Sequence, residues 1–227
     1  MSNQGRSCAF CGDRKNLTRE HIFPNGVIKR FEHDMVSYSD KSEKIFKSDL
    51  VVKDVCEYCN NVILSELDSS FIQLYEDFIR TPLQPGSNAE FKFDYNLLLR
   101  ELLKISFNSA RASADGFKSV KALKKYVPYI LGEVNEAPDV MLRLQIVTSS
   151  KKINTQTNEF EGLMEAELLR SCKIDYRGPK HSFFMIRLVA LNSFWFYLIF
   201  PIRKVSASRK ETFLSGFLDL FNLKGVP

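Results

Sequence analysis

Two Cys-x-x-Cys pairs have the clearest chemical signature in this chain of 227 residues. Cys8 and Cys11 form the first pair, and Cys56 and Cys59 form the second. Each pair can present two thiolates from a tight turn, and two pairs complete a tetrahedral zinc site. Gly12 follows the first pair and suits the positive φ that such a turn needs. Because all four ligands are cysteines, the pattern predicts a structural zinc with no open coordination position.

The first residues of the chain indicate the compartment in which the cysteines would act. The first residues are polar and lack the apolar core of a signal peptide, so we expect a reducing, cytoplasmic location. In such a location, cysteines serve as metal ligands or buried thiols rather than as disulfides. A redox pair would not need a second copy, which favours the metal site. The fifth cysteine, Cys172, is expected to be a semi-buried thiol.

The residues between and after the two pairs resemble a known family. Glu20-His21-Ile-x-Pro follows the first pair, and Asn60 directly follows the second. This order of elements is similar to that of the zinc-containing subgroup of HNH (ββα-metal) endonucleases. The resemblance covers residues 8 to about 68, which is less than a third of the chain.

The resemblance implies a β-hairpin and a helix that are clamped together around one divalent metal. It implies that His21 is the general base, and that Glu20 and Asn60 are ligands of the catalytic ion. The chemistry suits these residue types. An imidazole with a pKa of about 6.5 can accept a proton from water near neutral pH. Carboxylate and amide oxygens suit a hard cation such as Mg²⁺ or Mn²⁺.

The chain departs from the family's pattern at one motif position. The family usually has an asparagine shortly before the second cysteine pair, where it orients the base histidine, but residues 49–55 contain none. A backbone carbonyl, Asp49 or Asp54 could replace it, or the site could be inactive. Asn61 competes with Asn60 for the ligand role, and Asp68 is expected to be a helix-surface charge.

The elements that must position these residues can be predicted in outline. Residues 44–55 have the apolar content of a short strand or strand pair, and residues 59–80 have the apolar spacing of a helix. Residues 29–48 lack a clear period and are predicted to be a loop. Two prolines and a glycine within residues 81–88 indicate a boundary. We therefore divide the chain into an HNH-type zinc module, residues 1–84, and an accessory domain, residues 85–227.

The accessory domain shows helical and strand patterns in separate blocks. The predicted helices are 95–114, 119–131 and 209–221, and the predicted strands are 140–147, 182–191 and 194–202. The last two strands flank Asn192-Ser193 and are expected to form a hairpin whose aromatic residues build a core. The pattern predicts an α+β fold with an antiparallel sheet.

Charge is distributed unevenly along the chain. Residues 1–80 hold 11 basic and 13 acidic residues, a net charge of −2, whereas the remainder holds 21 basic and 14 acidic residues, a net charge of +7. The lysine cluster of the second predicted helix could contact phosphates or simply face solvent: Lys118, Lys121, Lys124 and Lys125. The longest apolar stretch, 183–201, contains Arg187, so two strands explain it better than a membrane span.

The residues together predict a metal-dependent HNH endonuclease that hydrolyses phosphodiester bonds in nucleic acid, with DNA favoured as the substrate. One alternative is a zinc scaffold without catalysis that binds nucleic acid or protein, which the missing asparagine favours. A weaker alternative is a regulatory protein whose C-terminal domain docks a protein partner. No role is assigned to His33 or His181.

Overall fold

Helices and antiparallel strands make up the described part of the chain, which confirms the α+β class. This computed structural model describes residues 7–14, 16–31, 36–39, 44–47, 50–113, 116–176 and 183–217, with the backbone alone for 36–39 and 44–47. Three residues considered in the sequence lie outside the described residues, namely His33, Asp49 and His181. Within the described residues, no helix is both long and apolar enough to cross a membrane.

The N-terminal part is organised around one pair of strands. Strand β1 (Leu17–His21) pairs antiparallel with β4 (Val51–Cys56), and a bulge interrupts the register next to Glu20. The short helix α1 (Asn25–Ile28) and a hairpin of β2 (Val36–Ser39) and β3 (Lys44–Lys47) lie between them in the sequence. The loop predicted for residues 29–48 is therefore wrong for the residues of β2 and β3, which pair as strands. Four-residue strands are too short to produce a distinct period in the sequence.

The second cysteine pair leads directly into a long helix. It runs from Cys59 to Ile79 in three consecutive segments, η1 (Cys59–Leu64), α2 (Ser65–Leu74) and η2 (Tyr75–Ile79). Its buried face follows the helical spacing and carries Leu64, Leu67, Phe71, Tyr75 and Ile79. The helix predicted for residues 59–80 is thus confirmed, although its first and last turns have π rather than α geometry.

Three helices follow the predicted boundary. Asp94 caps α3 (Tyr95–Ala112) by accepting a hydrogen bond from the Leu97 amide at 2.9 Å. The predicted helix 119–131 is observed as two helices, α4 (Gly116–Lys124) and α5 (Val127–Ile130). They are separate because Pro128 has no amide hydrogen to donate to the preceding turn.

The sheet of the C-terminal part has four antiparallel strands in the order β5-β10-β9-β8. Their bounds are Met141–Ile146 for β5, Phe194–Pro201 for β10, Phe184–Leu191 for β9 and Leu169–Ile174 for β8. The predicted hairpin is confirmed, and Asn192 adopts the positive φ of 48° that tight hairpin turns favour. Strand β8 was not predicted.

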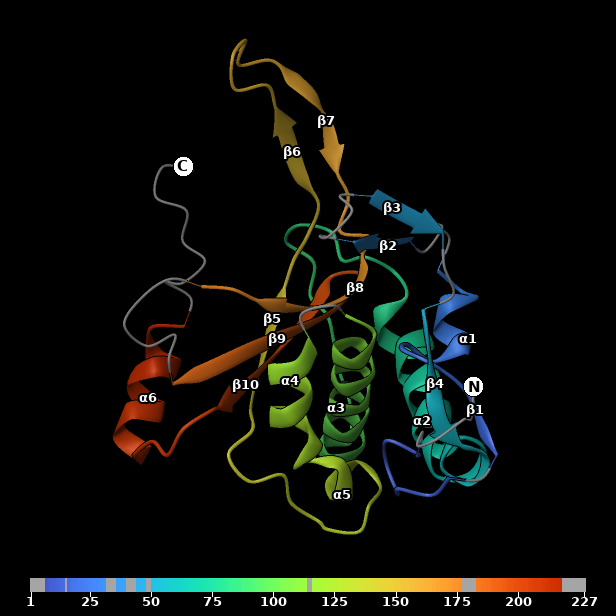
Figure 1. The fold of residues 1–227 in the computed structure, drawn as a ribbon. Coiled ribbons are helices and arrows are strands. Elements are labelled where there is room, and N and C mark those ends of the chain that lie inside the picture. Colours follow the sequence, from blue (N-terminus) through green and yellow to red (C-terminus); the bar gives the residue numbers. More distant parts are fainter. Residues whose placement is uncertain are drawn as a thin grey trace.

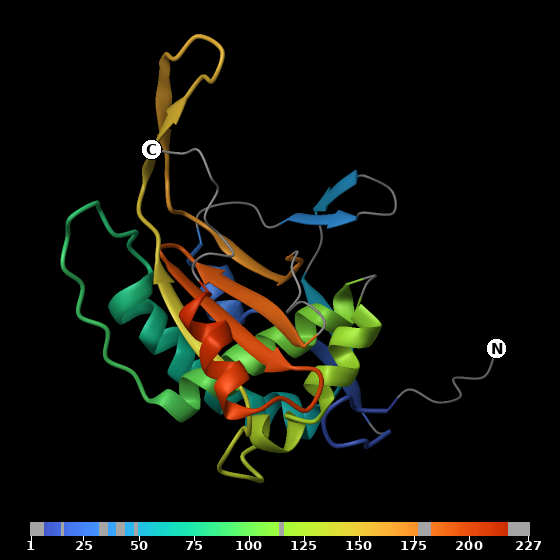
Figure 2. The same ribbon diagram turned by 90° about the vertical axis from the view of Figure 1, so that its left-hand side faces the viewer.

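The two faces of this sheet are covered by different helices (Figures 1 and 2). Alternate residues of β9 point to opposite faces. Phe184, Ile186 and Leu188 pack with Phe213 of α6 (Ala207–Ser215), whereas Val189 and Leu191 join the larger core that contains α3. The aromatic residues of β9 and β10 are mostly buried, so their predicted role in a core is confirmed.

A two-stranded ribbon projects from the end of the sheet in both views (Figures 1 and 2). It consists of β6 (Ser150–Ile153) and β7 (Phe160–Met164), which pair only with each other. Their residues are largely exposed, so no alternation of apolar and polar residues marked them in the sequence.

The core is continuous across the predicted boundary. Residues 80–94 contain no helix or strand, in agreement with the turn signals of residues 81–88. One buried cluster nevertheless includes Cys8 and Val55 on one side of that segment and Leu102 and Phe200 on the other. The division into two domains stays a prediction.

Candidate metal centre and candidate active site

The four predicted ligands of the zinc site lie together. The sulfur atoms of Cys8, Cys11, Cys56 and Cys59 are all within 4.8 Å of one another. Tetrahedral Zn–S bonds of about 2.3 Å place sulfur atoms about 3.8 Å apart, so the cluster could hold one metal ion such as zinc. Gly12 has the predicted positive φ, 81°, and its amide donates to the Cys8 carbonyl at 2.9 Å. Within the described residues, this is the one group of three or more His, Cys, Asp or Glu side chains close enough to hold an ion.

The backbone around the cluster favours the thiolate form of one cysteine. Burial alone would raise the pKa of Cys8, but backbone hydrogen bonds from Cys56, Cys11 and Phe10 outweigh it and lower the pKa to about 7. Burial raises the pKa of Cys11 and Cys59. The thiolate is the form that binds metal, so these backbone hydrogen bonds favour metal binding at Cys8.

Asn60 ties the second cysteine pair to strand β1. Its side-chain amide donates to the Thr18 hydroxyl at 2.8 Å and to the Arg19 carbonyl at 2.9 Å. The neighbouring Asn61 is exposed and accepts a hydrogen bond through its backbone from Ser65 at 2.7 Å. Asn60 is therefore the asparagine that contacts the strand of His21.

His21 ends strand β1 and is half-buried. The next residue, Ile22, donates through its amide to the Leu50 carbonyl at 2.7 Å. The His21 carbonyl accepts a hydrogen bond from the Asn108 side-chain amide of α3 at 3.2 Å. The backbone of the candidate base is thus held from two sides, by the chain next to β4 and by α3.

Glu20 points into the protein and is only 4% exposed. Its carboxylate lies 3.4 Å from the ammonium group of Lys104, which is fully buried on α3. Lys104 also pairs with Asp68 of α2, and it lies 3.0 Å from the Glu101 carboxylate. One buried cation therefore contacts three carboxylates from three elements. Asp68 was predicted to be a helix-surface charge, but it faces this buried ammonium.

The protonation of this cluster follows from its burial. Burial raises the pKa of Glu20, and Lys104 only partly opposes the rise. Burial likewise raises the pKa of Glu101, to about 8. Burial alone would lower the pKa of Lys104, but Glu101, Asp68 and Glu20 outweigh it and raise that pKa. The three carboxyl groups consequently keep the lysine charged, while burial makes the ionised form of Glu101 costly.

The polar residues of α3 form a stripe that the sequence analysis missed. Glu101, Lys104, Asn108 and Arg111 follow one another at intervals of three or four, so they share one face of the helix. The last of them, Arg111, lies 3.3 Å from the Asp54 carboxylate of β4 and stacks over the ring of Phe10 at 5.2 Å. The signal was the regular spacing of these polar residues among the buried apolar residues of the helix.

The remaining predicted residues are distributed as follows. Asp54, which the sequence offered as a partner of His21, pairs with Arg111. Cys172 is partly buried, as predicted. The four lysines of the α4 region are exposed and make no ion pair within the described ranges, and Lys125 lies 4.8 Å from the ring of Tyr126.

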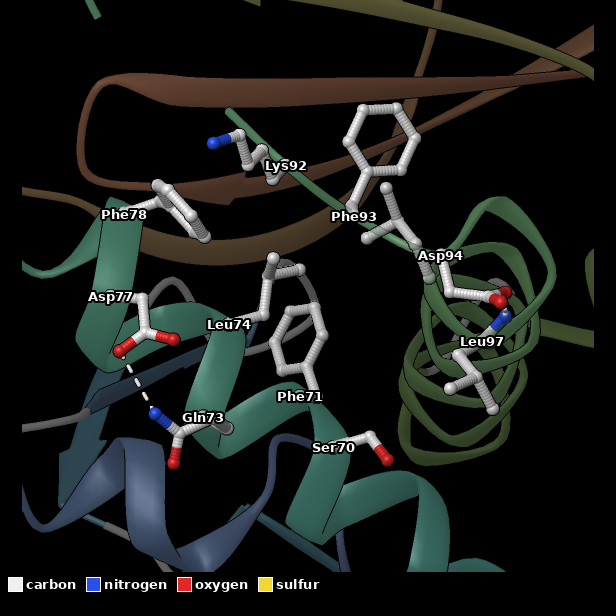
Figure 3. A pocket seen from close by; sticks show the side chains of 11 residues that line it. Ser70, Phe71, Gln73, Leu74, Asp77, Phe78, Lys92, Phe93, Asp94 and Leu97 are labelled. Carbon is white, nitrogen blue, oxygen red and sulfur yellow. Dashed lines mark hydrogen bonds between the residues drawn. The ribbon is translucent and has the colours of Figure 1, made fainter. Parts of the chain in front are cut away.

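A hollow of about 200 Å³ lies apart from these residues, between α2 and η2 on one side and the start of α3 on the other (Figure 3). Its lining is mainly apolar, with Phe71, Leu74 and Phe78 on the first side and Leu97 on the second. None of the predicted metal or catalytic residues lines it.

The comparisons with known proteins give no match, whether to a protein-family model, a curated protein or a solved structure. The function must therefore be argued from the chemistry of the described residues.

Proposed function

We propose that this chain is a metal-dependent endonuclease of the HNH type, with His21 as the general base and a structural zinc on the four cysteines. The observation that carries the proposal is that three segments far apart in the sequence lie close together in the structure: the first cysteine pair, the second cysteine pair with Asn60, and the strand that bears His21. Two cysteine pairs bring their sulfur atoms within 4.8 Å of one another, and Asn60 binds the backbone of Arg19, two residues before His21. The antiparallel pair of β1 and β4, followed by the helix that begins at Cys59, supports the proposal.

The chemistry assigned to His21 is proton transfer. Its half-buried side chain can accept the proton of a water molecule whose oxygen attacks phosphorus, while the bond from phosphorus to the leaving oxygen breaks. A divalent cation such as Mg²⁺ or Mn²⁺ would neutralise charge on the phosphate oxygens. The surroundings of Glu20 do not suit that cation, because the ammonium group of Lys104 already pairs with the Glu20 carboxylate. The amide oxygen of Asn60 is the better candidate ligand.

The zinc has a separate, structural role in the proposal. Four cysteine ligands leave no coordination position for substrate or water, so this ion would hold the fold and take no part in hydrolysis. The exposed lysines near α4 and the net charge of +7 after residue 80 favour nucleic acid as the substrate. We propose that this nucleic acid is DNA, and a cleavage assay on both DNA and RNA decides between them.

The test is cleavage of plasmid DNA and of RNA with Mg²⁺, Mn²⁺ or EDTA, by wild-type protein and by His21→Ala. We expect His21→Ala to lower the cleavage rate by about 10²-fold to 10⁴-fold. Zinc content and binding of substrate should stay near wild type. His181→Ala is the matched control, because it removes a histidine outside the motif and should cleave normally. Wild-type rates from folded His21→Ala protein would overturn the mechanism.

A second candidate function is a zinc scaffold that binds nucleic acid or protein without hydrolysis. The specific observation that favours it is the ion pair between Glu20 and Lys104, which occupies the carboxylate that the resemblance assigns to the catalytic ion. Binding without cleavage, for every nucleic acid and metal tested, would support this candidate against the nuclease.

A further inference from the structure

The polar stripe of α3 contacts the strand that bears the candidate base at two consecutive residues. Lys104 reaches the side chain of Glu20, and Asn108, one helical turn later, reaches the carbonyl of His21. Residues four apart on a helix lie on the same face, so one rigid surface holds both positions. Both α3 residues lie outside the stretch that carries the motif.

Lys104 is the one cation that forms an ion pair with Glu20 within the described residues, and the Arg111 guanidinium of the same helix adds a weaker attraction that lowers the pKa of this carboxyl. The Lys104 side chain is 0% exposed, and a buried ammonium is costly unless carboxylates surround it. Its other two carboxylates come from α2 and from α3 itself. Glu20 is thus the partner through which Lys104 binds β1, and its removal would leave that strand without a charged link to α3.

The contact with His21 is equally enclosed. Asn108 is fully buried, and its amide nitrogen lies 3.2 Å from the His21 carbonyl oxygen. The other end of the same amide, the Asn108 oxygen, has no hydrogen-bond partner among the residues that the structure describes. A buried asparagine that satisfies only its donor side is retained at a cost, and the one bond that it does make fixes the backbone of His21.

We infer that the Glu20 carboxylate binds Lys104 rather than a catalytic cation, and that Lys104 and Asn108 are positioning residues for His21. The positioning role rests on the proposed function, because it assumes that His21 is the general base. Through these two residues, α3 sets where the end of β1 lies and therefore where the imidazole meets a substrate. A displacement of about 1 Å at such a site can cost about 10²-fold in rate.

The first test is a double-mutant cycle on the full chain with Glu20→Gln, Lys104→Met and the combined variant. Removal of one partner of a buried pair is strongly destabilising. We expect each single variant to lower the Tm by roughly 10 °C, with the two decreases clearly less than additive in the combined variant. The Mg²⁺ or Mn²⁺ concentration for half-maximal cleavage should not change in Glu20→Gln.

The opposite pattern would overturn the assignment of Glu20. A Glu20→Gln protein with wild-type Tm that needs far more Mg²⁺ or Mn²⁺ would make this carboxylate a ligand of the ion. Because the Tm cycle needs no catalysis, it decides on the pairing even if the wild type cleaves nothing. Failure of the proposed function and failure of this inference are therefore distinguishable.

The second test separates positioning from stability. We expect Asn108→Ala, assayed far below its Tm, to lower kcat by about 10-fold to 10²-fold with KM and zinc content unchanged. Ser106→Ala is the matched control on the same helix, since Ser106 is also buried and its hydroxyl has no hydrogen-bond partner in the described ranges. A kcat of Asn108→Ala equal to that of Ser106→Ala would remove Asn108 from the positioning role.

Discussion

At the scale of single residues, the buried charges near Glu20 should make stability depend on pH. Burial raises the pKa of Glu101 from 4.5 to about 8, against the lowering effect of Lys104. The folded protein then binds more protons than the unfolded chain between these values, so Glu101 lowers stability as the pH rises through that range. Each unit of pKa difference corresponds to about 1.4 kcal/mol.

We expect Glu101→Gln, which cannot ionise, to lose less stability than wild type between pH of about 5 and about 8. The measurement is Tm against pH for both proteins, with zinc present throughout. Asp77→Asn is a suitable control, because Asp77 lies on η2, outside the Lys104 cluster. If the Tm of wild type and of Glu101→Gln changed with pH in parallel, the loss of stability would not come from the ionisation of Glu101.

The cysteine cluster makes a second prediction at this scale. If four thiolates hold one ion, elemental analysis should find about one zinc per chain. Binding of a structural zinc supplies folding free energy, so Cys56→Ser should destabilise or aggregate the N-terminal part. Cys172→Ser, which changes the cysteine outside the cluster, should keep both the zinc and the fold. A stable, zinc-free wild type with reactive thiols would contradict the site.

Residues differed in how far the sequence could predict them. The cluster of four cysteines was predictable because a repeated Cys-x-x-Cys spacing is typical of a site that holds one metal ion. The surroundings of Glu20 were not, because Lys104 belongs to a helix beyond the predicted boundary. A contact that orients the His21 side chain was expected from a backbone carbonyl, from Asp49 or from Asp54, all within or near the motif. Asp54 pairs with Arg111 instead, and Asp49 lies outside the described residues. The hydrogen bond from Asn108 to the backbone carbonyl of His21 was not expected, because Asn108 also lies on that later helix.

At the scale of elements, helix α4 and the residue after it present the clearest candidate surface for nucleic acid. Lys118, Lys121, Lys124 and Lys125 are exposed. If they bind phosphates, changing all four to glutamate should weaken DNA binding. The slope of log affinity against log salt should fall by roughly 0.9 for each phosphate that the variant no longer neutralises. Equilibrium binding at several salt concentrations measures this slope.

The control for that experiment is a pair of lysines on the projecting ribbon. Lys151 and Lys152 are also exposed, so their change to glutamate reproduces part of the charge reversal at a different place. An unchanged slope in the α4 variant, or the same change per charge in both variants, would assign the α4 lysines to a solvated surface.

Helices and strands were predictable where they are long and bury many residues. The helices at residues 59–79 and 95–112 and the hairpin of β9 and β10 have enough buried residues to show a regular spacing. Strands β6 and β7 were missed because they pack mainly on each other and bury little of their surface. Strand β8 was missed because only its first residue, Leu169, is fully buried.

At the scale of the whole molecule, the shared core predicts that the N-terminal module depends on α3. Phe10, between the first two cysteines, packs edge-on against Phe107 at 5.4 Å, and Glu20 needs Lys104. We expect a fragment of residues 1–84 to lack a cooperative thermal transition even with zinc. Circular dichroism during heating, with the full chain as reference, measures this. A fragment that unfolds cooperatively would instead support two separate domains.

The hydrogen bond between Asn108 and His21 also joins positions that are made at different times, since they are 87 residues apart in the chain. A ribosome that adds about 5–20 residues per second needs roughly 4–17 seconds to pass from one to the other. For about half of that interval the growing chain contains all four cysteines but lacks Lys104. Burying the Glu20 carboxylate without its cation would be costly, so the carboxylate should stay in water. Strand β1 can therefore take its final place only after α3 has been synthesised, however early the four cysteines come together.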